Sequence, residues 1–143
     1  MLNFNDGPDI LARTIWGEAR GESRDGKVAV ACVVRNRAQS KTSWWRKAEG
    51  VTDPFAAVCL CPRQFSCWNP SDPNLKKIKA LTLEDPVFQE CAAIANAVII
   101  GSLPDITDGA THYYANRMKK PPSWAGVLTV TRSIGGHMFL RDR

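Results

Sequence analysis

The hydrophobic positions of this chain follow helical periods that are separated by short non-periodic loops, which predicts a mainly helical protein. Apolar residues at helical spacing favour a first helix from about Pro8 to Arg20, with Asp6 as its N-cap. The run 28–34 is apolar throughout and precedes a basic segment, 35–38. This pattern favours a central helix covered on every side over a buried strand.

Further helices and one hairpin follow along the chain. Each of these helices starts with an aspartate that precedes a proline, a pair that caps a helix and fits its first turn. They are predicted from 53 to 59, from 72 to about 80, and from 85 to 100, where Gly101 ends the last one. The segment 128–132 has β-propensity, 133–136 supplies a turn and 137–140 returns, which predicts a small C-terminal β-hairpin. The fold class is therefore α+β, mainly α.

An acidic segment near the N-terminus combines helical spacing with charge. On a helix, Leu11, Ile15, Glu18 and Glu22 fall within about 60° of one another, so two carboxylates continue an apolar stripe. Burial of a charged carboxylate is costly, and it raises the pKa toward the range that a general acid needs. We predict that Glu18 is a catalytic acid at the end of the first helix. The alternative is a surface ion pair between Glu18 and one of the nearby arginines, Arg13, Arg20 or Arg24.

Two other segments carry residues that suit a sugar site. The loop 62–70 combines Gln64, Phe65 and Ser66 with tryptophan and asparagine. Planar amides match sugar hydroxyls, and aromatic faces stack on the apolar faces of pyranose rings. The pair 44–45 consists of two tryptophans in a basic loop, where they either stack on a sugar or envelope surface or anchor the loop on the core.

Size, composition and charge restrict the class of protein. The 143 residues are 44% hydrophobic and 23% charged, which is typical of one globular domain and excludes a disordered chain. No apolar run is long enough to span a bilayer, and no secretion signal is present, so we expect synthesis in the cytoplasm without membrane insertion. The net charge of +5 favours polyanionic partners, but the basic residues are scattered and no nucleic-acid motif occurs.

The cysteines favour a reducing compartment. There are five, so at least one stays unpaired. Cys59, Cys61 and Cys67 are close in sequence, but their spacing lacks a second knuckle and both histidines lie far away. We expect packed free thiols, no metal and no cofactor.

Several short motifs, taken together and in order, resemble the SleB-like family of bacterial cell wall hydrolases, known from spore-cortex-lytic enzymes and phage lysins. The set is specific because it spans nearly the whole chain, although no single motif is decisive. The matching stretches are 12–22 (ARTIWGEARGE), 26–31 (GKVAVA), 33–37 (VVRNR), 64–66 (QFS), 109–114 (GATHYY), Trp124 and 134–139 (IGGHMF).

The resemblance implies a single lysozyme-like, lytic-transglycosylase-like catalytic domain over 1–143, with no separate binding domain. It implies cleavage of the β-1,4 bond between MurNAc and GlcNAc in peptidoglycan, with Glu18 at the position of the catalytic glutamate. One carboxyl group would protonate the glycosidic oxygen and then take the proton of the MurNAc C6 hydroxyl, which closes a 1,6-anhydro ring. A second carboxylate across the cleft, Glu22 or Asp25, would instead allow hydrolysis, as in a muramidase. We expect Glu22 to be a structural partner, paired with an arginine or hydrogen-bonded in the Gly21 turn.

The resemblance also implies supporting residues around Glu18. We expect Asn36 to hydrogen-bond to backbone near the end of the Glu18 helix, and Trp124 to belong to the site. His137 either takes a direct part or only secures its turn. The residues expected to line the substrate cleft are Gln64, Phe65, Ser66, Tyr113, Tyr114 and Asn116.

A compact, basic chain without a leader fits a phage endolysin that acts as a monomer and reaches the wall after the membrane is permeabilised. A piece of a longer secreted enzyme is the alternative origin. Two other function classes stay open. One is a non-catalytic peptidoglycan-binding or phage structural module in which Glu18 is only an ion-pair partner. The other is nucleic-acid binding driven by charge.

Overall fold

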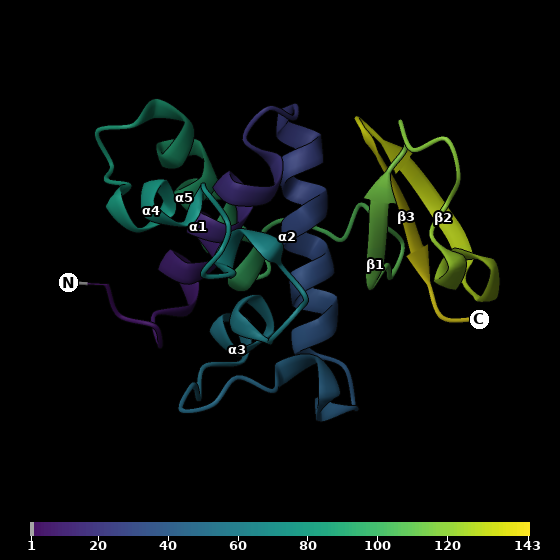
Figure 1. The fold of residues 1–143 in the computed structure, drawn as a ribbon, viewed down its shortest axis with the longest axis horizontal. Coiled ribbons are helices and arrows are strands. Elements are labelled where there is room, and N and C mark those ends of the chain that lie inside the picture. Colours follow the sequence, from purple (N-terminus) through teal and green to yellow (C-terminus); the bar gives the residue numbers. More distant parts are fainter. Residues whose placement is uncertain (1) are drawn as a thin grey trace.

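The computed structural model describes residues 2–143. Within this range five α-helices and a three-stranded antiparallel sheet form the fold, and α2 stands between the other helices and the sheet (Figure 1). The helices are α1 (Gly7–Ala19), α2 (Arg24–Ala38), α3 (Pro54–Leu60), α4 (Leu75–Ala80) and α5 (Pro86–Ile99). The strands are β1 (His112–Ala115), β2 (Thr129–Ile134) and β3 (His137–Arg141). The predicted class, mainly α with a small β component, is confirmed.

Aspartate caps determine where three helices begin, as the sequence predicts. The side chains of Asp6, Asp53 and Asp85 each accept a hydrogen bond from the backbone N–H three residues further on. The helix predicted from 72 is shorter than expected. Asp72 accepts from the backbone N–H of Asn74 (2.7 Å) in a preceding turn, so α4 begins only at Leu75.

α2 is the central buried helix that its apolar run predicts. Every residue from Val28 to Val34 is buried. One side of α2 packs on α1, α3 and α5, and the other side meets the sheet through a small apolar cluster. This cluster joins Ala29 and Val33 of α2 to Ala110 and Phe139. It holds the sheet against the helical part of the fold.

The end of α1 corrects one step of the sequence argument. The helix stops at Ala19 with Arg20 as its C-cap, so the helical projection holds for Glu18 but is wrong for Glu22. Gly17, one residue before Glu18, is where another part of the chain comes close. A Cβ atom there would lie 2.8 Å from Cys67, so glycine allows the 3₁₀ turn Ser66–Trp68 to pack on α1.

The sheet has one strand more than the predicted hairpin. β2 and β3 form that hairpin, while β1 pairs antiparallel with the other edge of β3 and gives the order β1-β3-β2. Tyr113 of β1 lies opposite Phe139 of β3. The four residues of β1 are too few for a period-two pattern to be recognised. This strand matters for the site described below because it brings Tyr113 to Glu18 of α1.

All five cysteines are buried free thiols, as the sequence predicts. Burial raises the pKa of Cys59 and of Cys91 to about 12, so both stay protonated at neutral pH. Within residues 2–143, every helix falls short of the length and apolar character that crossing a bilayer requires.

Candidate active site

Glu18 lies in the last turn of α1 and contacts β1. Its Oε1 accepts a hydrogen bond from the hydroxyl of Tyr113 at 2.7 Å. Burial raises the pKa of Glu18, and the negative charge of Asp72 adds to this, while the Tyr113 hydrogen bond and Arg37 act in the opposite direction. The net result is a carboxyl group that holds its proton at a higher pH than an exposed glutamate does.

The ion-pair alternative for Glu18 is wrong. Arg13 binds Asp9 at 2.8 Å instead. Arg20 lies over the Trp16 ring, 4.3 Å from its centroid, and Arg24 is exposed at the start of α2. No salt bridge within residues 2–143 involves Glu18.

Glu18 faces a cleft of about 520 Å³. Among residues 2–143, Glu18 is the only carboxylate in the lining of this cleft. The other groups are aromatic, amide or basic, which is the mixture that sugar sites use. The lining residues are Glu18, Arg37, Trp44, Trp45, Arg63, Gln64, Phe65, His112, Tyr113 and Trp124.

A row of aromatic rings forms one wall of the cleft. The ring centroids of Trp44 and Trp45 are 5.0 Å apart, those of Trp45 and His112 5.2 Å, and those of His112 and Trp124 5.2 Å. Trp45 is buried, whereas Trp44 is 54% exposed. Trp45 therefore anchors its loop on the core. Trp44 has an exposed ring, and its stacking on a sugar stays a prediction.

Arg37 lies behind the cleft as a buried cation. Its Nε donates to the carbonyl of Thr111 at 2.8 Å, and its guanidinium lies over the rings of Trp45 (4.3 Å) and Phe65 (5.2 Å). Burial lowers the pKa of Arg37 to about 10, so it stays charged at neutral pH. The sequence does not reveal this role, because position 37 belongs to the basic end of α2 and looks like a helix-dipole partner.

The loop residues expected to line the cleft divide into two groups. Gln64 and Phe65 line it, and the Gln64 side chain lies 3.5 Å from Arg37. Ser66 is exposed and lies outside the lining. Arg63 and His112 line the cleft as well, although the sequence argument assigned them no role. His112 was visible in the matching stretch 109–114, but Arg63 left no signal beyond its charge.

Glu22 is bound away from the cleft. Its Oε1 accepts from the backbone N–H of Gly136 at 2.8 Å and lies 3.8 Å from Nδ1 of His137. The partner of Glu22 is therefore the turn between β2 and β3. The prediction that Glu22 pairs with an arginine or hydrogen-bonds in the Gly21 turn is wrong. Gly135 allows this approach, because a Cβ there would lie 2.5 Å from the Glu22 carboxylate. Asp25 is exposed and does not line the cleft.

His137, Tyr114 and Asn116 surround the site without lining the cleft. The His137 ring packs edge-on against Tyr113, with centroids 4.9 Å apart, and burial lowers its pKa. Tyr114 packs against Trp124 at 6.1 Å. The side chain of Asn116 donates to the carbonyl of Gly135 at 3.0 Å, so it secures the turn and does not face the cleft as expected.

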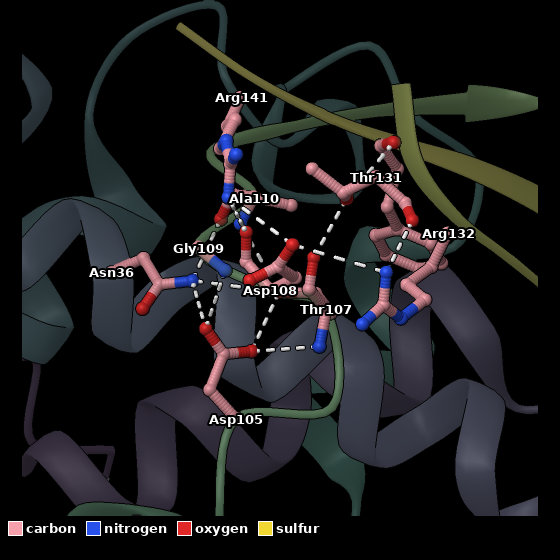
Figure 2. A network of polar contacts seen from close by, with 10 residues as sticks. Asn36, Asp105, Thr107, Asp108, Gly109, Ala110, Thr131, Arg132 and Arg141 are labelled. Carbon is pink, nitrogen blue, oxygen red and sulfur yellow. Dashed lines mark hydrogen bonds and ion pairs between the residues drawn. The ribbon is translucent and has the colours of Figure 1, made fainter. Parts of the chain in front are cut away.

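Asn36 connects α2 to the segment before β1. Figure 2 shows its amide directed at Asp105, and Nδ2 donates to Asp105 Oδ2 (3.0 Å) and to the carbonyl of Ala110 (2.8 Å). The expected contact near the end of the Glu18 helix is wrong. Asn36 and Arg37 instead hold the carbonyls of Ala110 and Thr111, the two residues directly before His112 and Tyr113.

No group of three or more histidine, cysteine, aspartate or glutamate side chains within residues 2–143 is arranged to hold a metal ion.

Comparison with known proteins identifies the family. Residues 21–140 match the Cell Wall Hydrolase family. This match starts three residues after Glu18, so the argument for that residue depends on the geometry of the cleft.

Two curated relatives are spore cortex-lytic enzymes. The protein from Halalkalibacterium halodurans is 26% identical over 130 residues, and these cover 91% of this chain and 33% of the relative. The protein from Oceanobacillus iheyensis is 24% identical over 133 residues, which cover 92% of this chain and 40% of the relative. The chain thus spans well under half the length of these two proteins.

Two solved domain structures share the fold. The catalytic domain of the Bacillus cereus SleB protein has a TM-score of 0.64 and 23% identity, over 94% of this chain and 89% of that one. The catalytic domain of the germination-specific lytic transglycosylase SleB from Bacillus anthracis gives the same score and identity, over 94% and 93%. The fold that the resemblance implied is confirmed, and with the family match over most of its length the chain belongs to the cell wall hydrolase family.

Proposed function

We propose that this chain cleaves the β-1,4 bond between MurNAc and GlcNAc in peptidoglycan as a lytic transglycosylase, with Glu18 as general acid and then general base. The observation that carries the proposal is the setting of Glu18. Its carboxyl has a raised pKa, accepts from the Tyr113 hydroxyl, and is the single carboxylate lining the described cleft. The spore cortex-lytic names of two relatives agree with a peptidoglycan substrate.

The reaction needs two proton transfers, one from Glu18 and one back to it from a different group. Protonated Glu18 gives its proton to the glycosidic oxygen as the C1–O bond of MurNAc breaks, and GlcNAc leaves with a free hydroxyl. The resulting carboxylate then removes the proton of the MurNAc C6 hydroxyl, whose oxygen bonds to C1. A 1,6-anhydro ring forms, Glu18 is protonated again, and no water is consumed.

Tyr113 has a positioning role in this scheme. Its hydroxyl fixes the Glu18 carboxyl at 2.7 Å and stabilises the anion that exists between the two proton transfers. Burial and the charge of Glu18 raise the pKa of Tyr113 well above its ordinary value, so it stays a hydrogen-bond donor throughout.

A hydrolytic muramidase would need a second carboxylate on the cleft. Glu22 is bound to the turn at Gly136, and Asp25 is exposed outside the cleft. Asp72 is close enough to raise the pKa of Glu18, but its Oδ1 accepts from Asn74 and it does not line the cleft. These three positions favour the one-carboxylate reaction.

The experiment is mass spectrometry of the soluble products released from purified peptidoglycan by wild type, Glu18→Gln and Glu22→Gln. The proposal predicts anhydro products, lighter than hydrated muropeptides by one water molecule, that disappear with Glu18→Gln and persist with Glu22→Gln. Hydrated products would refute the transglycosylase reaction and direct attention to Asp72. Release of equal product by Glu18→Gln would refute the role of Glu18.

We further propose that the chain works as a monomeric endolysin, made in a bacterial cytoplasm and acting on the wall after the membrane is permeabilised. Buried free thiols suit a chain made under reducing conditions. When the chain is expressed in a bacterial host, the culture should stay turbid while the cells are intact. It should clear once a membrane-permeabilising agent is added. Lysis without that agent would contradict the proposal.

A further inference from the structure

The cleft around Glu18 carries more positive charge than a neutral sugar chain requires. Arg37 and Arg63 are its two cations. Burial raises the pKa of Glu18, and burial together with Arg37 lowers the pKa of His112, so both shifts favour the neutral form of the group. No salt bridge within residues 2–143 involves either arginine. An uncompensated positive potential of this kind attracts an anionic ligand.

The two arginines differ in how free their donors are. Arg37 is buried and already donates to Thr111 and toward Gln64. Arg63 is exposed, and no hydrogen bond of its side chain occurs within the described part of the chain. Its guanidinium therefore keeps the planar pair of donors that binds a carboxylate through both oxygens.

The backbone of Arg63 supports a functional reason for this residue. Its φ angle is 67°, in the left-handed region that glycine or asparagine adopts more easily than arginine. The turn that imposes this angle is closed by a hydrogen bond from Gln64 N to the carbonyl of Cys61. A strained residue of this type at the mouth of a cleft points to a role for the side chain.

The chemistry of the substrate defines which anion is available. A chain of alternating GlcNAc and MurNAc has no charge in its sugar rings. Its carboxylates belong to the muramyl substituent, either in the stem peptide or, where the peptide is missing, in the free lactyl group. We propose that Arg63, supported by the field of Arg37, binds a carboxylate of this substituent, so that the cleft selects glycan strands that carry anionic substituents over neutral ones. This inference rests on the proposed function.

The experiment compares three preparations of one glycan. The first carries stem peptides, and the second has lost them to an amidase and exposes lactyl carboxylates. The third is the amidase-treated glycan with its lactyl carboxyl groups coupled to ethanolamine by carbodiimide, which makes it neutral. KM and kcat are measured for wild type, Arg63→Gln, Arg63→Lys and the control Arg24→Gln, which changes an exposed arginine outside the cleft.

For wild type we expect KM to rise about fivefold on the neutral glycan, the size of an exposed ion pair, with kcat little changed. Arg63→Gln should raise KM by a similar factor on an anionic glycan and add nothing further on the neutral one, because the same interaction is already lost. Arg63→Lys should recover part of the loss, and Arg24→Gln should match wild type. An effect on the peptide-bearing strands alone assigns the carboxylate to the peptide, and an effect on the amidase-treated strands assigns it to the lactyl group.

Equal KM values of wild type on anionic and neutral glycan would overturn the inference, as would equal losses for Arg63→Gln on all three preparations. If wild type cleaves none of the preparations, the proposed function has failed instead. Co-sedimentation of wild type and Arg63→Gln with the same three polymers then tests the inference without catalysis. Equal binding of wild type to all three would overturn it.

Discussion

The connection between α2 and β1 makes Asn36→Ala the most informative substitution outside the cleft. The change removes the Nδ2 donor that binds Asp105 Oδ2 at 3.0 Å and the Ala110 carbonyl at 2.8 Å. One of these bonds is charge-assisted, and both are partly buried. A neutral hydrogen bond contributes about 1 kcal/mol and one to a charged group about 2 kcal/mol, so the free energy of unfolding should fall by about 3 kcal/mol.

Thermal and chemical denaturation measure this loss. For a chain of this size about 3 kcal/mol corresponds to a decrease in Tm of roughly 6 to 12 °C. The matched control is Asn96→Ala in α5, an exposed asparagine whose Nδ2 binds only the carbonyl of Ala92 in its own helix. Because alanine is the better helix former there, the control should change stability by no more than about 0.5 kcal/mol.

The pH dependence of the same variant gives a second test. Burial alone would raise the pKa of Asp105, but hydrogen bonds from Thr107, Asn36 and Gly109 outweigh it and lower the pKa. Asp105 therefore contributes stability that is present above its unfolded pKa and is lost as the pH falls through its lower folded pKa. Asn36→Ala removes one of these donors. The difference in the free energy of unfolding between wild type and the variant should therefore become smaller as the pH is lowered.

Activity should fall together with stability, because the two carbonyls that Asn36 and Arg37 bind immediately precede the strand that brings Tyr113 to Glu18. A decrease in kcat at a temperature where the variant is fully folded would support this positioning role. If Asn36→Ala costs no more stability than Asn96→Ala, the reasoning about this connection is refuted.

Three further predictions concern the site. Glu18→Gln keeps an acceptor for Tyr113 and removes a carboxyl group with a raised pKa. The stability contributed by that group is present below its unfolded pKa and is lost as the pH rises through its folded pKa. The Tm of the variant should therefore exceed that of wild type more at about pH 7 than at about pH 4, and an equal difference at both pH values would contradict this. Tyr113→Phe removes a donor that lowers the Glu18 pKa, so the pH at which kcat/KM declines should move upward, and an unchanged profile would argue against the contact. Gly135→Ala places a Cβ 2.5 Å from the Glu22 carboxylate at a φ of 54°, so it should lower the free energy of unfolding by more than about 1 kcal/mol. The control Gly126→Ala, whose Cβ would have no atom within 4 Å, should not lower it. Equal effects of the two substitutions in denaturation would show that the turn has no such constraint.

The sequence predicted best where the deciding interactions are local. Asp6, Asp53 and Asp85 cap their helices through bonds that span three residues, and the apolar run 28–34 shows its burial directly. Glu18 was found in the same way, as an acidic residue on an apolar helical stripe. Its position at the cleft agrees with that prediction, while its catalytic role stays a prediction.

The errors occur where distant segments meet. Strand β1 forms because it pairs with a free edge of β3, and its four residues are too few for a pattern that predicts a strand. Asn36 bonds to the segment before β1, although it was expected to bond near the end of α1. Glu22 bonds to the β2–β3 turn, although an arginine or the Gly21 turn was expected as its partner. Arg63 carries no local signal at all, because a surface arginine and a cleft arginine look alike in a sequence.

The sequence by itself therefore determined the helical framework, the burial of the central helix α2 and the choice of Glu18 as the candidate residue, because caps and periodicity act over a few positions. The tertiary structure decided which groups surround that residue. Glu18 and Tyr113 are 95 positions apart along the chain, and only the packing of the sheet against α2 brings their oxygens to 2.7 Å. A site assembled from such distant contacts cannot be predicted from any single stretch of sequence, because its geometry depends on the packing of every element between the contacting residues.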